Sequence, residues 1–209
     1  MTCCKCGHEF CWICSKKWSR HGEDGYDCNK YNENEESKKN QAKSALQRYL
    51  FHYERYNNHA LSLKLQDKLR KNVNRIVNYM TEMASLGFAE SKLFEKAITT
   101  LNECRKVLMY TYIFAFYVKK NNHLEIFENN QRDLEIMVEK LCAHLEHEDY
   151  GCDSDIDSDT IRTIDTAYIK QRVQNLTRYC DRRKQVLIDH VNEGTNNGTY
   201  WVFNEAGCD

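Results

Sequence analysis

The sequence predicts a mainly α-helical protein, in which a small cysteine-rich module precedes an elongated bundle of about five helices. Six of the eleven cysteines lie before residue 29. The chain has no proline, and no glycine falls between Gly25 and Gly87 or between Gly87 and Gly151. Such long stretches without a helix breaker, with apolar residues recurring every three or four positions, are typical of helices.

The cysteine-rich module, residues 1–32, has the spacing of a metal site. Two Cys-x-x-Cys pairs are followed by a histidine and a further cysteine. Such pairs direct two thiolates at one zinc ion, which takes four ligands in a tetrahedron. The predicted ligands are Cys11, Cys14, His21 and Cys28 for one complete zinc site, and Cys3 and Cys6 for half of a second site. No obvious ligands further along the chain complete the second site.

Residues 33–193 are expected to form the helical domain, and residues 194–209 a C-terminal tail. The expected helices are Glu35–Asn57 with a bend at Asn57–Asn58, Ala60–Ser85, Ala89–Lys120, Leu124–Glu146 and Thr160–Val191. The third helix is apolar on every side from Met109 to Val118, which predicts a central position in the bundle. The fourth and fifth helices each carry one apolar stripe, which predicts that they pack around the third.

Three further cysteines, the histidines and an acidic run also allow predictions. Cys104, Cys142 and Cys180 lie on or beside the apolar stripes, so they are expected to be small buried hydrophobic residues. The histidines after residue 48 share no ligand spacing and are expected to pack in the bundle. The acidic run around residues 153–159 fails the calcium-loop pattern, because Ser158 replaces the glycine and Ile164 the final glutamate. It is therefore predicted to be a solvated loop.

Composition limits the possible classes of function. The formal net charge is −1, which gives no electrostatic reason to expect binding to nucleic acid or to a membrane surface. The longest apolar run, Val107–Val118, is too short for a membrane span of about 20 residues. An odd number of cysteines with Cys-x-x-Cys spacing, and no visible signal peptide, favours metal binding in a reducing compartment. The expected location is the cytosol or the nucleus.

Several runs of the chain resemble a known family. The cysteine-rich module, from Cys3 through Cys14 and on to Asn32, resembles the final half of the catalytic zinc domain of RBR-type (RING–in-between-RING–RING) ubiquitin ligases. Seven runs resemble the helical Ariadne domain that follows it in the Ariadne family: Ala45–Phe51, Arg55–His59, Leu108–Tyr112, Phe114–Tyr117, Lys119–Asn122, Ile126–Gln131 and Arg178–Cys180. The resemblance covers nearly the whole chain and is weakest after Glu193.

This resemblance implies an enzyme family but not activity of this chain alone. RBR ligases accept ubiquitin from a conjugating enzyme as a cysteine thioester and pass it to a lysine amine. In the alignment with the family, the nucleophile would lie three residues before Met1, and its partner histidine immediately before Met1. Glu9 aligns with the carboxylate of the catalytic site. Cys4 is a spare thiol without an obvious base, and is expected to be a non-ligand loop residue.

The resemblance also implies regulation. In the family the Ariadne domain covers the catalytic module until a NEDD8-modified cullin–RING ligase binds. Glu128 and Glu139 match acidic positions of that inhibitory contact, although a solvated helix face would explain them equally. The family's neighbouring Phe-Glu pair is replaced here by Leu65 and Gln66, a departure that would weaken the docking.

Two functions follow from different classes. The chain is either the C-terminal part of an Ariadne-type ubiquitin ligase, or a non-catalytic zinc-stapled helical module that binds cullin–RING or other partners in the ubiquitin system. A zinc protein that binds nucleic acid is disfavoured by the even charge balance.

Overall fold

The structure, a computed structural model, describes residues 9–11, 17–21, 28, 41–84, 88–146, 166–198 and 200–204. This part of the chain contains a 3-10 helix η1 (Trp18–Arg20) and the helices α1 (Gln41–Lys64), α2 (Gln66–Ala84), α3 (Phe88–Tyr117), α4 (Asn122–Glu146) and α6 (Thr166–Asn197). Its only extended pairings are two isolated bridges. The prediction of a mainly α-helical protein is confirmed.

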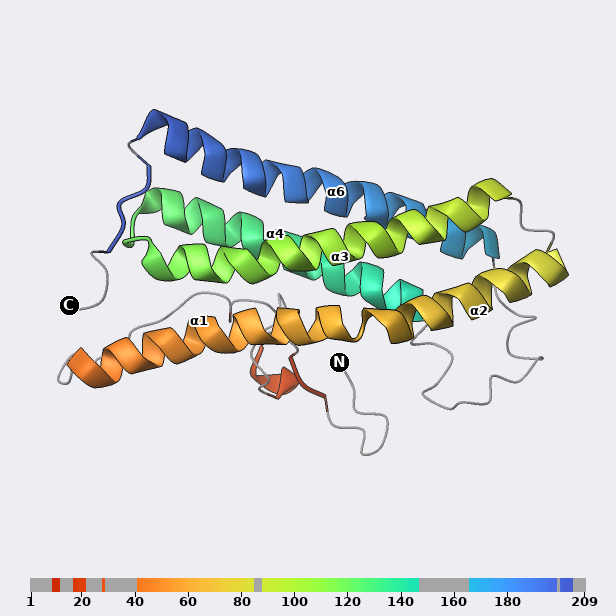
Figure 1. Ribbon diagram of the computed structural model, residues 1–209, viewed down its shortest axis with the longest axis horizontal. Helices are drawn as coiled ribbons and strands as arrows, with labels where there is room; N and C mark the ends of the chain where they lie inside the picture. Colours follow the sequence, from red (N-terminus) through yellow and green to blue (C-terminus); the bar gives the residue numbers. More distant parts are fainter. Residues whose placement is uncertain are drawn as a thin grey trace.

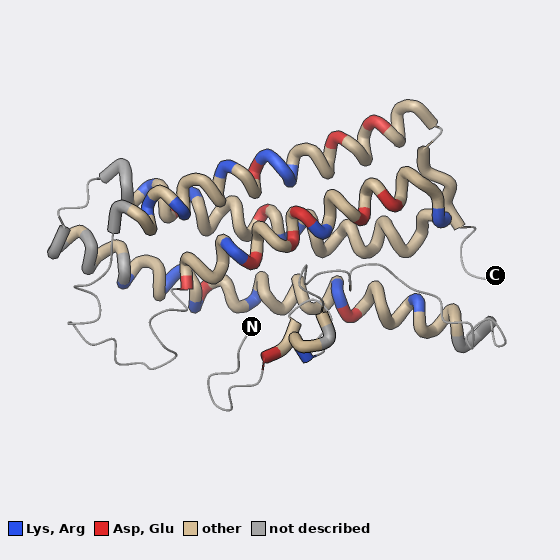
Figure 2. The backbone as a smooth tube through the Cα atoms, turned by 180° about the vertical axis from the view of Figure 1, so that it is seen from behind, with Lys and Arg blue, Asp and Glu red and all other residues tan. Residues whose placement is uncertain are grey.

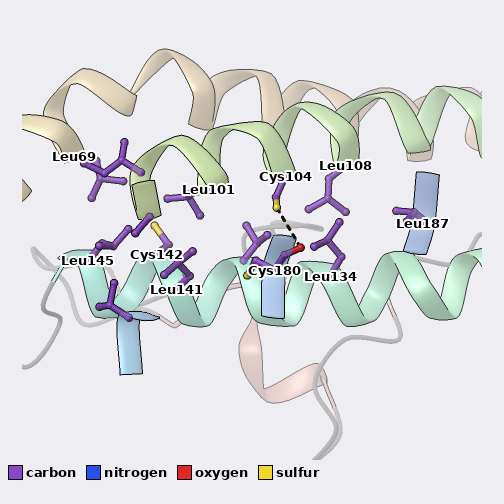
Figure 3. Packing of buried hydrophobic residues seen from close by; sticks show 14 of the residues in the cluster. Leu69, Leu101, Cys104, Leu108, Leu134, Leu141, Cys142, Leu145, Cys180 and Leu187 are labelled. Carbon is purple, nitrogen blue, oxygen red and sulfur yellow. Dashed lines mark hydrogen bonds between the residues drawn. The ribbon is translucent and has the colours of Figure 1, made fainter. Parts of the chain in front are cut away.

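The long helices lie side by side in an elongated bundle, with α1 and α2 following each other along one edge (Figure 1). Helix α3 packs against α1, α2, α4 and α6, which confirms the central position predicted from its apolar sequence. Leu101 and Leu108 of α3 meet Leu134 and Leu141 of α4 in the core, and all four are fully buried (Figure 3). Burying these side chains is the main stabilising contribution to such a bundle.

The bend predicted at Asn57–Asn58 is wrong, because α1 continues through both asparagines. The break falls eight residues later, at Leu65, where the backbone amide is shared between the carbonyls of Leu61 and Ser62, both at 3.2 Å. The hydroxyl of Ser62 donates to the carbonyl of Asn58 at 3.0 Å. A serine hydroxyl that binds the carbonyl one turn back competes with the helix ladder and bends the helix.

The C-terminal residues are attached to the bundle. Helix α6 passes its expected end at Val191 and continues to Asn197, and the chain then turns at Gly198, whose φ is 64°. The amide of Lys119 donates to the carbonyl of Val202, and the amide of Asn204 to that of Tyr117, both at 2.7 Å. The short tail therefore pairs with the end of α3 and places Trp201 in the core. The expected start of the last helix at Thr160 and the acidic loop lie outside the described residues.

The three cysteines predicted to be packing residues are buried and unpaired. The thiol of Cys104 on α3 lies 3.7 Å from the carbonyl oxygen of Cys180 on α6 (Figure 3). Burial raises the pKa of Cys104, Cys142 and Cys180 to about 12. These thiols are therefore protonated at neutral pH and behave as small apolar side chains.

Lysine and arginine residues are mixed with aspartate and glutamate over the described helices, without strict alternation (Figure 2). None of these helices combines the length and the apolarity that crossing a membrane requires.

Candidate metal centre and its contact with the helical bundle

Three of the four predicted ligands of the complete zinc site come together. The ligand atoms of Cys11, His21 and Cys28 all lie within 4.8 Å of one another. The two sulfur atoms are 3.8 Å apart. Two thiolates bound at about 2.3 Å to one tetrahedral zinc ion would be separated by about 3.8 Å, so the spacing fits zinc.

The local backbone explains how these ligands meet. Phe10 and Lys17 form an antiparallel bridge, and the amide of Trp18 donates to the carbonyl of Glu9 at 3.1 Å. This pairing brings the residue before Cys11 next to the residue before η1. The amide of His21 then donates to the carbonyl of Trp18 at 2.9 Å, and the two rings stack with their centroids 5.4 Å apart. The histidine is thereby turned toward the two cysteines.

The other predicted site residues are placed as follows. Cys14, Cys3, Cys6 and the spare thiol of Cys4 lie outside the described residues. Glu9 is exposed on the bridge that precedes the metal site. Glu128 and Glu139 are partly buried on α4, Leu65 is half exposed at the break between α1 and α2, and Gln66 is the first residue of α2.

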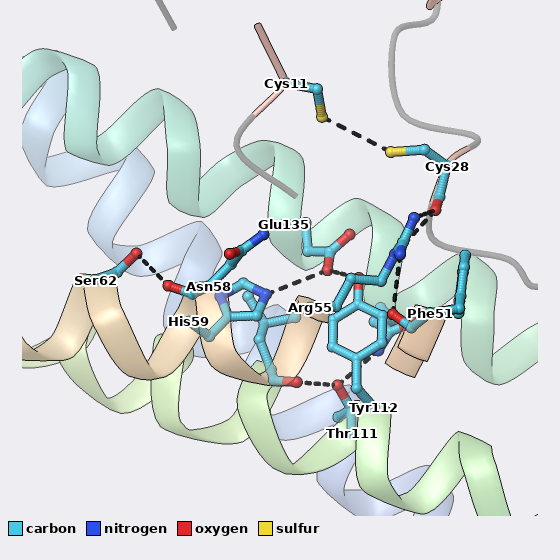
Figure 4. Close-up of polar contacts among 12 residues, drawn as sticks. Cys11, Cys28, Phe51, Arg55, Asn58, His59, Ser62, Thr111, Tyr112 and Glu135 are labelled. Atoms are coloured by element: carbon cyan, nitrogen blue, oxygen red, sulfur yellow. Dashed lines mark hydrogen bonds and ion pairs between the residues drawn. The ribbon is translucent and has the colours of Figure 1, made fainter. Parts of the chain in front are cut away.

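The metal centre lies against the bundle, and Arg55 of α1 makes the polar part of this contact. Its Nε donates to the carbonyl of Cys28 at 3.1 Å, and its Nη2 donates to the same oxygen (Figure 4). Its Nη1 donates to the carbonyl of Phe51 at 3.0 Å, and its guanidinium carbon lies 3.5 Å from the centroid of the Phe51 ring. Only 4% of the Arg55 surface is exposed. The guanidinium is thus held in one orientation, toward a ligand residue.

Tyr112 of α3 makes the apolar part of the contact. It is fully buried and packs with Cys11, while Trp18 and Cys28 cover the same cluster. Burial removes solvent from the sulfur of Cys11, which strengthens the electrostatic interactions of a bound thiolate.

Beneath the metal centre, His59, Tyr112 and Glu135 form a buried polar cluster. The hydroxyl of Tyr112 donates to Oε1 of Glu135, and Nε2 of His59 lies 3.5 Å from the same oxygen (Figure 4). The rings of His59 and Tyr112 stack with centroids 5.8 Å apart. The pKa of Tyr112 is raised well above its usual value, first by burial and then by the charge of Glu135. The tyrosine therefore remains a hydrogen-bond donor to this carboxylate.

A second group of buried polar side chains extends the cluster along α3 and α4. Nε2 of Gln131 donates to the hydroxyl of Thr111 at 2.7 Å, and a guanidinium nitrogen of Arg105 donates to the thiol of Cys142 at 3.0 Å. Burial raises the pKa of Glu139, and the charge of Arg105 opposes that rise. The charge of Arg105 thus favours the ionised form of Glu139, but burial outweighs it.

Arg55 and Tyr112, which contact the metal centre, were not predicted as site residues, and neither were His59 and Glu135, which lie behind Tyr112. The sequence of α1 contained one indication of this contact, because Arg55 and His59 are four residues apart and therefore share one helix face. Glu135 gave a second signal, since its charged side chain sits beside Leu134 in the apolar stripe of α4. A charge in such a stripe requires a buried partner.

Comparison with known proteins agrees with the described architecture. The family profile described as the Ariadne domain matches residues 47–185. E3 ubiquitin-protein ligase ari-1.1 of Caenorhabditis elegans is 40% identical over 98% of this chain and 40% of its own length. Ariadne-1 of Drosophila melanogaster is 41% identical over 96% of this chain and 38% of its own length. ARIH1 of Homo sapiens is 42% identical over 90% of this chain and 32% of its own length.

The chain thus spans two fifths or less of the length of these relatives. Within that span, the similarity covers both the cysteine-rich module and the bundle, since 98% of the chain is aligned with the nematode ligase. The chain therefore belongs to the Ariadne family of RBR-type E3 ubiquitin ligases.

Proposed function

We propose that this chain is the C-terminal portion of an RBR-type ubiquitin ligase, in which a zinc-stabilised module is held against a regulatory helical domain. The similarity to E3 ubiquitin ligases over 90 to 98% of the chain carries this proposal. In the intact enzyme, ubiquitin would pass from a conjugating enzyme to a cysteine thioester and then to a substrate lysine, in ubiquitin-dependent catabolism. The cytosol or the nucleus would be its place of action.

The proposed zinc site consists of Cys11, Cys14, His21 and Cys28. Three of these ligands already have the spacing of a tetrahedral zinc site. With four protein ligands and no open position, the ion would stabilise the fold of the module and take no part in the chemistry. Cys3 and Cys6 would contribute half of a second site.

The proposed role of this chain is to hold and regulate the catalytic module. The contact of Tyr112 and Arg55 with the metal centre supports this role, because a helical domain that packs against the module can restrict access to the module. Glu128, Glu135 and Glu139 are seven and four residues apart and lie along one face of α4. Since Glu135 lies beneath the metal centre, Glu128 and Glu139 on the same face would extend the inhibitory contact. Leu65 and Gln66 would replace the aromatic and acidic pair of the family.

The first test measures zinc and thioester formation on the 209-residue chain. Native mass spectrometry should find one zinc ion per chain, and incubation with a charged conjugating enzyme should give no ubiquitin thioester. A thioester that disappears in Cys4→Ala would contradict the proposal that this chain contains no nucleophile. Two tightly bound zinc ions would show that Cys3 and Cys6 complete a second site.

The second test concerns regulation and the partner. We expect the chain to bind a NEDD8-modified cullin–RING ligase more tightly than the unmodified form in a calorimetric titration. In a longer protein that includes the upstream cysteine, Glu139→Ala should increase the rate of ubiquitin discharge. Discharge that is absent in the longer protein, together with retained cullin binding, would favour the non-catalytic module.

A further inference from the structure

We infer that Arg55, a residue of the helical domain, positions the ligand Cys28 and thereby sets the affinity of the metal centre for zinc. This inference rests on the zinc site of the proposed function. It concerns a residue outside the module that supplies the ligands, so the ligand spacing alone does not reveal it.

The first argument is geometric. Two nitrogens of Arg55 converge on the carbonyl oxygen of Cys28, the residue whose sulfur lies 3.8 Å from that of Cys11. The carbonyl and the sulfur belong to the same residue, so fixing the first restricts the second. The guanidinium is itself fixed by the carbonyl and the ring of Phe51. Groups that orient a metal ligand in this way commonly change metal affinity 10- to 100-fold when they are removed.

The second argument is electrostatic. Three thiolates and a neutral histidine around Zn²⁺ leave a net charge of about −1 in the centre. Arg55 is buried and always protonated, and it contacts the ligand residue Cys28. In a site with little solvent, this positive charge stabilises the net negative charge of the centre.

Because Arg55 contacts Cys28, zinc binding should also affect the stability of the helical domain. If zinc binding orders Cys28, it also gives the buried guanidinium of Arg55 its acceptor. Loss of zinc would leave a buried charged donor with fewer partners, which destabilises the bundle. Zinc affinity and the stability of the helical domain should therefore change together, although the ligands come from the small module.

The experiment measures the zinc dissociation constant of the 209-residue chain by competition with a chromophoric chelator. Arg55→Gln should weaken zinc binding about tenfold. Arg55→Lys keeps the charge but loses the two-pronged contact, and should give a smaller loss. Arg48→Gln is the matched control, because Arg48 lies two turns earlier on α1 and donates to the carbonyls of Phe116 at 2.6 Å and Val118 at 3.3 Å. It should leave the zinc affinity unchanged.

Thermal unfolding with and without zinc provides a second readout. The increase in melting temperature on adding zinc should be reduced in Arg55→Gln and Arg55→Lys but retained in Arg48→Gln. If Arg55→Gln does not fold, the comparison of Arg55→Lys with Arg48→Gln and the unmodified chain still tests the inference. Equal zinc affinities for the Arg55 variants, Arg48→Gln and the unmodified chain would overturn the inference. Failure of the unmodified chain to bind zinc would instead refute the proposed zinc site.

Discussion

The hydroxyl of Tyr112 on α3 donates a hydrogen bond to the carboxylate of Glu135 on α4, and both side chains are buried beneath the metal centre. The pair joins the two helices at the point where Cys11 packs on the bundle. A buried carboxylate is strongly destabilising unless donors compensate its charge. Tyr112 therefore makes two contacts at once: its ring packs against Cys11 of the module, and its hydroxyl binds Glu135 of α4.

Tyr112→Phe tests this relationship. The substitution keeps the ring against Cys11 but removes the donor to Glu135, so we expect the free energy of unfolding to fall by about 1–3 kcal/mol. Urea denaturation followed by circular dichroism measures the change. Tyr110→Phe is the control on the same helix, because Tyr110 is 60% exposed, and it should change stability by less than about 0.5 kcal/mol. Equal effects of the two substitutions would contradict the role of the hydroxyl.

His52 predicts acid sensitivity of the bundle. Burial, followed by the charges of Arg48 and Arg55, lowers the pKa of His52 from 6.5 to about 3. Between these values the unfolded chain binds a proton that the folded chain does not, so stability is complete above pH 6.5 and falls as the pH drops toward 3.

Unfolding at pH 7.5 and pH 5 measures this contribution. On acidification, the unmodified chain should lose about 2 kcal/mol more stability than His52→Gln. Acid release of zinc affects both proteins, so it cancels in the comparison. Parallel losses in the two proteins would show that His52 does not cause the acid sensitivity.

Gly194 predicts that a better helix former will destabilise α6. An alanine in an ordinary helix position is about 1 kcal/mol more favourable than glycine. At Gly194, however, a Cβ atom would lie 2.2 Å from Nε1 of Trp201, which donates to the carbonyl of Val191 at 3.1 Å. Gly194→Ala should therefore displace Trp201, lower the melting temperature and change the tryptophan fluorescence.

Gly198 supplies the control for that experiment. It has a positive φ of 64° with open space around it, and asparagine tolerates this backbone conformation. Gly198→Asn should leave stability and fluorescence nearly unchanged. A stabilised Gly194→Ala variant with unchanged fluorescence would show that Trp201 does not pack against α6.

The buried cysteines predict selective chemical labelling. With pKa values of about 12 and almost no access to solvent, Cys104, Cys142 and Cys180 should not react with iodoacetamide at pH 7.5 in the folded chain. Removing zinc with a chelator should expose Cys11 and Cys28 to the reagent, while these three remain protected. Full denaturation should label all of them, as peptide mass spectrometry would show. Labelling of Cys104 without denaturant would mean that α3 and α6 separate.

The helices could be predicted because local signals determine them, and the spacing of the cysteines allowed a prediction of the metal ligands. The absence of proline, the spacing of glycines and the apolar periodicity located α3 and α4 to within a few residues. A Cys-x-x-Cys pair that begins at Cys11, followed by a histidine and a further cysteine, likewise predicted Cys11 and Cys28 as ligands. The position of the α1–α2 break was not predictable in this way, because no glycine, proline or change of periodicity marks Leu65, and serine and threonine hydroxyls make the bond that Ser62 makes in unbroken helices as well.

By itself, therefore, the sequence determined the helical class and the family, and it predicted the zinc ligands. The tertiary structure alone decided that the metal centre rests on the bundle through Arg55 and Tyr112, above Glu135. Arginine, tyrosine and glutamate are common on solvated helix faces, and their spacing along one chain does not reveal a partner on another helix. Burial makes each of them dependent on that partner, and only the packing of α1, α3 and α4 brings the partners within contact.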